Sequence, residues 1–127
     1  MKRAILAIKN TLVLEAVANA LKKIGIFVEK ATTQDGEMII NLTNAFSATL
    51  LVMDVTRSND CMFDMRMNTV HQIKEQNNEI KIAFLCDNIS DKDNAYKVKC
   101  AKEEGRIDAF FYESVPSDYL ADAIDAL

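Results

Sequence analysis

Glycine and proline are scarce in this chain, which has three glycines and one proline among 127 residues. The three glycines are isolated, so neither of the glycine-rich loops that cradle nucleotide phosphates is present. No linker rich in proline or glycine divides the chain, and its length suits one compact domain. The sequence therefore predicts a single domain over residues 1–127.

Cysteine and histidine are also too few for a disulfide framework or a zinc site. Cys61, Cys86 and Cys100 are odd in number and lack CxxC spacing. His71 is the only histidine and has no partner at metal-ligand spacing. Reduced thiols are the simplest explanation, and they predict a cytoplasmic location.

No segment of the chain is strongly basic, and no apolar run is long. The net charge is −4 and the lysines and arginines are scattered, so we expect no direct binding to nucleic acid. The first apolar run, Ala4 to Ile8, ends at Lys9. Five residues are too few for a signal peptide or a membrane span, so no membrane contact is expected.

Apolar runs alternate with helical periods five times along the chain. The runs that predict strands are Ala4 to Ile8, Ile26 to Glu29, Thr49 to Met53, Ile82 to Leu85, and Ala109 to Tyr112. Five βα units in this length predict an α/β fold with helices on both faces of a parallel sheet. We expect a flavodoxin-like (βα)5 three-layer sandwich with strand order 2-1-3-4-5.

Helical periods fill the segments between these runs. In the second helix, Thr33 is the predicted cap. The third helix uses one apolar face, formed by Phe63, Met67, Val70 and Ile73.

Asp54 ends the most apolar run in the chain and should lie at the carboxyl end of the third strand. In open α/β sheets, ligands and chemistry collect at that edge. The expected strand order brings six residues together there: Lys9, Asn10, Asp54, Cys86, Asp87 and Glu113. Aspartate also commonly begins loops and caps helices, so position alone leaves a structural role open.

At these spacings the chain resembles, from end to end, a receiver domain of two-component response regulators. Members of that family carry an acidic pair after strand one, a phosphoacceptor aspartate after strand three and a hydroxyl residue after strand four. An aromatic switch residue within strand five and a lysine after it complete the pattern. The resemblance implies that Asp54 is at the phosphoacceptor position and Phe110 at the aromatic one. The remaining positions depart from the pattern and hold Lys9, Asn10, Cys86 and Glu113.

These departures weaken the site for Mg²⁺ and phosphate. Lys9 removes an oxygen ligand that the metal needs, and Glu113 reverses the charge of the family's lysine. We therefore expect no metal, no cofactor, no catalytic residue and no enzymatic activity. One interpretation is that the Lys9 ammonium faces Asp54 and Glu113 in place of the metal. The other is that Lys9 extends into water while Asp54 caps the next loop.

Cys86 lies at the predicted end of the fourth strand, where a nucleophile could act. No histidine is near it in the sequence, and the neighbouring Asp87 would disfavour a thiolate. We interpret Cys86 as a small buried apolar group.

Three functions stay open. The favoured one is an atypical receiver, a pseudo-receiver, that acts as an interaction or dimerisation module for protein partners such as a sensor kinase or an output domain. The second is a functional receiver that a histidine kinase phosphorylates at Asp54. The third is a small flavodoxin-like cofactor binder, which the loop Lys9 to Leu12 disfavours because it lacks a phosphate-binding composition rich in serine, threonine and glycine.

A homodimer is expected through the fourth helix, fifth strand and fifth helix. Charges of both signs are interspersed there with aromatic residues, and such charges can pair across a two-fold axis. The residues of this face are Lys97, Lys99, Lys102, Glu103, Glu104 and Arg106 beside Tyr96, Phe110, Tyr112 and Tyr119.

Overall fold

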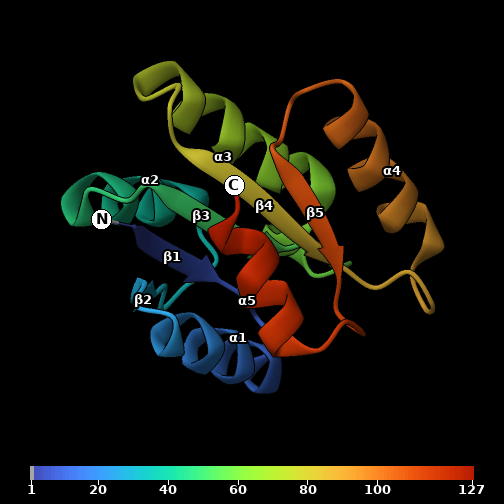
Figure 1. The fold of residues 1–127 in the computed structure, drawn as a ribbon. Coiled ribbons are helices and arrows are strands. Elements are labelled where there is room, and N and C mark those ends of the chain that lie inside the picture. The colour runs from blue at the N-terminus through green and yellow to red at the C-terminus, as the bar shows by residue number, and fades with distance from the viewer. Residues whose placement is uncertain (1) are drawn as a thin grey trace.

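Five parallel strands form the central sheet of the computed structural model, which describes residues 2–127 (Figure 1). The strands are β1 (Arg3–Ala7), β2 (Phe27–Lys30), β3 (Leu50–Asp54), β4 (Lys81–Cys86) and β5 (Ala109–Tyr112). Their order is β2-β1-β3-β4-β5, with every pairing parallel. The predicted flavodoxin-like (βα)5 fold and strand order are therefore confirmed, and no strand end differs from its prediction by more than one residue.

Helices cover both faces of this sheet and make the fold a three-layer sandwich (Figure 1). One face carries α1 (Thr11–Lys23) and α5 (Ser117–Asp125), and the other carries α2 (Gly36–Phe46), α3 (Phe63–Gln76) and α4 (Lys92–Glu103). A short 3₁₀ turn, η1 (Asn59–Cys61), precedes α3. None of the helices in residues 2–127 is long and apolar enough to cross a membrane.

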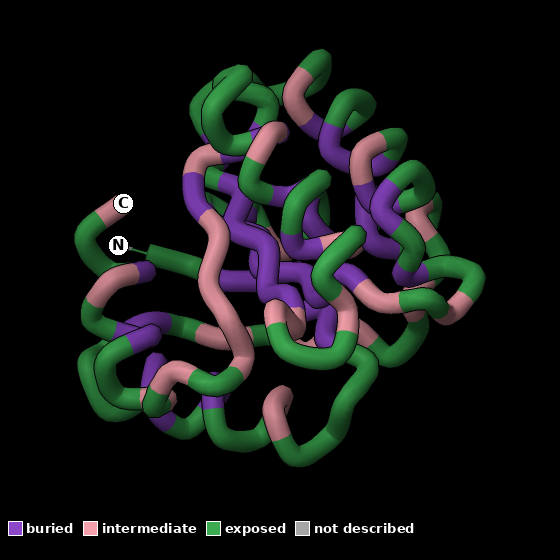
Figure 2. The backbone as a smooth tube through the Cα atoms, turned by 90° about the vertical axis from the view of Figure 1, so that its right-hand side faces the viewer, coloured by how far each residue is buried: buried purple, intermediate pink, exposed green. Residues whose placement is uncertain are grey.

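The central strands are buried on both faces, which explains their continuous apolar sequences. Every residue of β3 is buried, and in β1 and β4 only the first residue is exposed. Figure 2 shows the same contrast, with the buried tube inside and the exposed turns of the helices outside. The apolar run of β3 thus leads directly to Asp54 at its carboxyl end.

Side-chain caps set where two helices begin beside this edge. The Asn10 side chain caps α1, where its Oδ1 accepts hydrogen bonds from the backbone N–H groups of Leu12 at 3.0 Å and Val13 at 3.2 Å. Asp35 caps α2, so the prediction of Thr33 was wrong. Thr33 lies three residues before the helix starts and accepts a hydrogen bond from the backbone N–H of Asp35.

Helices α2 and α3 approach each other closely at Gly36. A Cβ atom added there would lie 2.4 Å from Oγ1 of Thr69, closer than atoms can approach. Glycine at this first position of α2 therefore lets its N-terminus pack against α3. The preceding loop, which contains Gln34, is held next to the sheet edge near Asp54.

Candidate functional site

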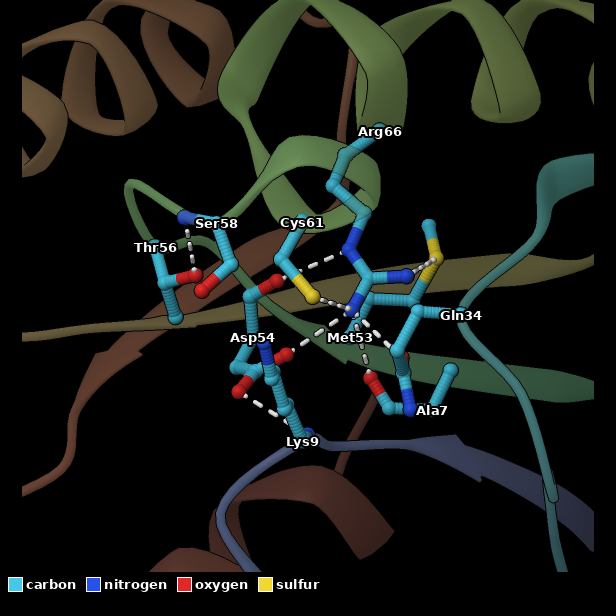
Figure 3. A network of polar contacts seen from close by, with 9 residues as sticks. All are labelled: Ala7, Lys9, Gln34, Met53, Asp54, Thr56, Ser58, Cys61 and Arg66. Carbon is cyan, nitrogen blue, oxygen red and sulfur yellow. Dashed lines mark hydrogen bonds and ion pairs between the residues drawn. The ribbon is translucent and has the colours of Figure 1, made fainter.

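Asp54 and Arg66 form a buried ion pair at the carboxyl edge of the sheet (Figure 3). Nη2 of Arg66 lies 2.8 Å from Oδ1 of Asp54, and each side chain is only 1% exposed. Nε of Arg66 also donates to the backbone carbonyl of Asp54 at 2.9 Å. A charge this deeply buried is stable only when it is paired and hydrogen-bonded. The negative charge of Asp54 is thus balanced from within the protein.

The Arg66 guanidinium also joins several elements around Asp54. Nη2 donates to the backbone carbonyl of Ala7 at 3.0 Å and to Oε1 of Gln34 at 2.7 Å. Nη2 also lies 3.3 Å from Cys61 Sγ, and Nη1 lies 3.7 Å from Met53 Sδ. One side chain from α3 therefore ties together β1, β3, the loop before α2 and the η1 turn (Figure 3).

The second carboxylate oxygen of Asp54 is occupied as well. Oδ2 accepts a hydrogen bond from the backbone N–H of Lys9 at 3.0 Å. Within residues 2–127, no ion pair joins the Lys9 ammonium to Asp54 or Glu113, so the interpretation of Lys9 as the internal cation was wrong. Arg66 approaches Asp54 from the buried side and compensates its charge, which leaves the Lys9 side chain in water.

A hollow of about 460 Å³ lies on the solvent side of Asp54. Its lining comes from the end of β3, the start of α1 and the loops that follow β1, β3 and β5. The lining residues are Lys9, Asn10, Thr11, Asp54, Thr56, Ser58 and Glu113. The predicted meeting of Lys9, Asn10, Asp54 and Glu113 is confirmed. Cys86 and Asp87, which were expected at the same edge, do not line this hollow, and neither does Phe110.

Glu113 is the carboxylate of the hollow that has no ion-pair partner among residues 2–127. Its backbone N–H is fixed by a 3.0 Å hydrogen bond to the carbonyl of Cys86. Its carboxylate has no hydrogen-bond or ion-pair partner among residues 2–127 and remains half-buried. Burial raises the pKa of Glu113 above its usual value, and the negative charges of Asp54 and Asp87 raise it further. The charged groups that shift the pKa of this carboxylate are therefore both negative.

Cys86 ends β4 beneath the same edge and is fully buried. Its Sγ lies 3.8 Å from the backbone carbonyl of Phe111. Burial raises the pKa of Cys86 to about 12, with further contributions from the negative charges of Glu113 and Asp87. A thiol in this state is protonated at neutral pH, which agrees with its interpretation as a small apolar group.

Phe110 occupies the predicted aromatic position within β5 and is half-buried. Its ring packs edge to face against Tyr112, with centroids 5.7 Å apart and planes at 66°. This pair lies on the side of the sheet that α4 covers.

Sequence reasoning missed Arg66, although a signal for it exists. Arg66 lies three residues after Phe63, four before Val70 and seven before Ile73, which places it on the apolar face of α3. A cation in the middle of such a face must find a buried partner. Asp54, at the end of a buried strand, is the carboxylate within its reach.

The carboxylates at this edge do not form a metal-binding cluster. Residues 2–127 contain no cluster of three or more histidine, cysteine, aspartate or glutamate side chains arranged to hold a metal ion. Within the hollow, the two carboxylates are Asp54, whose oxygens already have donors, and Glu113.

Known proteins that share this architecture are found among solved structures. Neither protein-family models nor curated proteins give a match. Solved structures do match, among them the response regulator TrrA from Thermotoga maritima in complex with Mg²⁺ and BeF. The two sequences are 17% identical, the match covers 99% of this chain and 98% of that chain, and the TM-score is 0.74. A CheY-like receiver domain protein from Methanospirillum hungatei has 20% identity, coverages of 99% and 92%, and a TM-score of 0.74.

A third similar structure belongs to a family of streptococcal redox sensors that evolved from two-component response regulators. It has 16% identity and a TM-score of 0.79, and the match covers 99% of this chain and 50% of that one. The fold of this chain is the receiver fold of response regulators, as its sequence predicts.

Proposed function

We propose that this chain is a pseudo-receiver, a signalling domain that binds protein partners without phosphorylation of Asp54. The observation that carries this proposal is the occupation of both Asp54 carboxylate oxygens, one by Arg66 and the other by the Lys9 backbone. In the receiver pattern, the equivalent oxygens must be available to Mg²⁺ and to the phosphoryl group. Here an internal guanidinium supplies the positive charge that the metal would supply.

Phosphorylation of Asp54 by a histidine kinase is the alternative, and it would require the buried ion pair to open. Breaking such a pair costs about 3–5 kcal/mol, because one charge is left buried without its partner. Mg²⁺ would also have to bind beside Lys9, and the incoming phosphate beside Glu113. Each of these changes opposes phosphoryl transfer.

Redox sensing is the property named for the streptococcal neighbour, and the buried thiols of this chain do not favour it. Burial raises the pKa of Cys61 and of Cys86, and oxidation requires an accessible thiolate. A flavodoxin-like cofactor site is also disfavoured, because the loop after β1 uses Asn10 to cap α1 rather than to hold a phosphate.

We expect Mg²⁺ with beryllofluoride to leave the amide spectrum of this protein unchanged around Asp54. The reason is that neither carboxylate oxygen is free to join a metal shell. The measurement is a ¹⁵N NMR titration at millimolar Mg²⁺ and beryllofluoride that follows Lys9, Asn10 and Val55. The Thermotoga regulator, which forms such a complex, is the positive control. Saturable shifts centred on Asp54 would show a working phosphoacceptor and contradict the proposal.

The partner-binding face of the pseudo-receiver is proposed to be the one formed by α4, β5 and α5. β5 is an edge strand, so this face lies at one end of the sheet. Tyr96 on α4 and Tyr119 on α5 are 68% and 65% exposed. Exposed lysines on α4 and exposed aspartates on α5 give the face both charge signs, and an isologous contact could pair them.

A homodimer through this face should be sensitive to salt, because exposed charge pairs are screened. We expect Lys99→Glu, on the exposed side of α4, to weaken dimerisation several-fold at low salt. Lys23→Glu, in the last turn of α1, makes the same charge change outside the three elements of this face and should have no effect. Analytical ultracentrifugation at two salt concentrations measures both. A monomer at high protein concentration, or equal effects of the two variants, would exclude this dimer.

A further inference from the structure

We propose that the hollow beside Glu113 binds an organic cation, the guanidinium or ammonium group of an arginine or lysine side chain. The inference rests on the proposed function, because a hollow that still received Mg²⁺ and phosphate would not be open to such a group. It goes further in assigning a ligand class to the site. That class has the opposite charge to the phosphoryl group for which the receiver edge is otherwise suited.

The unpartnered carboxylate of Glu113 is the feature of the hollow that favours a cation. Asp54 is neutralised from below by Arg66, so its charge is already compensated. Glu113 has no partner among residues 2–127, and Asp87 adds a second negative charge near it. Lys9 lines the same hollow but forms no ion pair with Glu113. Burial is the main cause of the raised pKa of Glu113, and the negative charges of Asp54 and Asp87 add to it. A cationic ligand would remove this repulsion, whereas a phosphate would increase it.

The donors and acceptors of the lining also suit such a group. A guanidinium is planar and can donate two parallel hydrogen bonds to one carboxylate, here Glu113. The hydroxyl groups of Thr11, Thr56 and Ser58 line the same hollow and can accept further hydrogen bonds. Mg²⁺ instead needs several oxygen ligands in octahedral geometry, and the Asp54 oxygens are occupied.

An exposed apolar residue that follows a lining residue in the chain favours a protein partner over a free small cation as the source of this group. Leu12 follows Thr11 directly and is 82% exposed, although it belongs to the first turn of α1. An arginine within a peptide could place its head group in the hollow and a neighbouring apolar side chain against Leu12. A free cation would make no use of Leu12.

Methylguanidinium chloride is the first probe, titrated into ¹⁵N-labelled full-length protein with sodium chloride as the ionic-strength control. We expect saturable amide shifts at Thr11 and Glu113. Glu113→Gln should reduce the affinity about tenfold, since it removes a charge-assisted hydrogen bond. Glu104→Gln is the matched control, because Glu104 is an exposed carboxylate that pairs with Arg106 on the surface. It should leave the affinity unchanged.

Two further variants test how Lys9 and Leu12 affect binding. Lys9→Met removes the cation that lines the hollow and should raise the affinity for methylguanidinium several-fold. Acetyl-leucyl-arginine amide should bind more tightly than methylguanidinium, and Leu12→Ala should abolish only that difference. Equal binding of the two probes would overturn the protein source and assign the site to free cations.

Different results would contradict the cation site and the pseudo-receiver. Absent methylguanidinium shifts, or shifts that Glu113→Gln does not weaken, would overturn the cation site and leave the pseudo-receiver intact. Saturable shifts with Mg²⁺ and beryllofluoride would overturn the pseudo-receiver itself.

Discussion

Arg66→Met is expected to lower the free energy of unfolding by about 3–5 kcal/mol. Methionine has a similar length and can fill part of the buried space, so the main loss is the charge opposite Asp54. The Asp54 carboxylate would then remain buried with the Lys9 backbone N–H as its donor. The carbonyl groups of Ala7 and Asp54 would also lose their bonds to the guanidinium. Urea denaturation followed by circular dichroism measures the change.

Arg57→Met is the matched control for this loss. Arg57 also forms an ion pair, with its Nη2 3.4 Å from Oδ1 of Asp91, but its side chain is 73% exposed. Pairs of this kind contribute about 0–1 kcal/mol, because water already solvates the charge. If both variants lose the same stability, the buried pair is not what holds this edge of the sheet together.

The double variant Asp54→Leu/Arg66→Met separates the ion pair from the packing around it. Removing both charges leaves no unpaired ion in the interior, so the double variant should be more stable than Arg66→Met alone. A double-mutant cycle with Asp54→Leu gives the coupling between the two side chains. Additive losses would mean that Asp54 and Arg66 do not depend on each other.

The arrangement of the sheet was predictable because burial on both faces leaves a plain mark in the sequence. The run before Asp54 is apolar at consecutive positions, as a strand covered by helices on both faces must be. The alternation of apolar runs and helical periods then predicted five βα units, and the flavodoxin-like fold supplied their strand order. From that order alone, Lys9, Asn10 and Glu113 could be placed beside Asp54.

The pairing of Arg66 with Asp54 could not be predicted from the strand order. Strand order indicates which loops meet at an edge, and this reasoning led to Lys9 rather than Arg66. Arg66 reaches Asp54 from the helix that packs over the sheet, so its contact depends on the rotation of α3 about its axis. The apolar period restricts that rotation, but only the packed structure shows that the guanidinium reaches the carboxylate. Lys9 meanwhile contributes its backbone, which side-chain chemistry could not indicate.

In the folded protein, Cys86 is expected to react with iodoacetamide about three orders of magnitude more slowly at pH 8 than an ordinary exposed thiol. A thiol with a pKa of about 12 is ionised about a thousandfold less at this pH than one with a pKa near 8.5. Full burial of Cys86 slows the reaction further, because the reagent cannot reach Sγ. Mass spectrometry of peptides after timed alkylation measures the rate at each cysteine.

Cys100 supplies the internal comparison, because it is partly exposed on α4. It should be alkylated first, and Cys100→Ser should leave almost no labelling of the folded protein. In urea, Cys61 and Cys86 should react readily, because unfolding removes both the burial and the neighbouring charges. Rapid alkylation of Cys86 in the folded protein would mean that the edge of the sheet opens in solution. Asp54 would then be accessible as well, because the two strand ends are adjacent, and phosphorylation would regain its support.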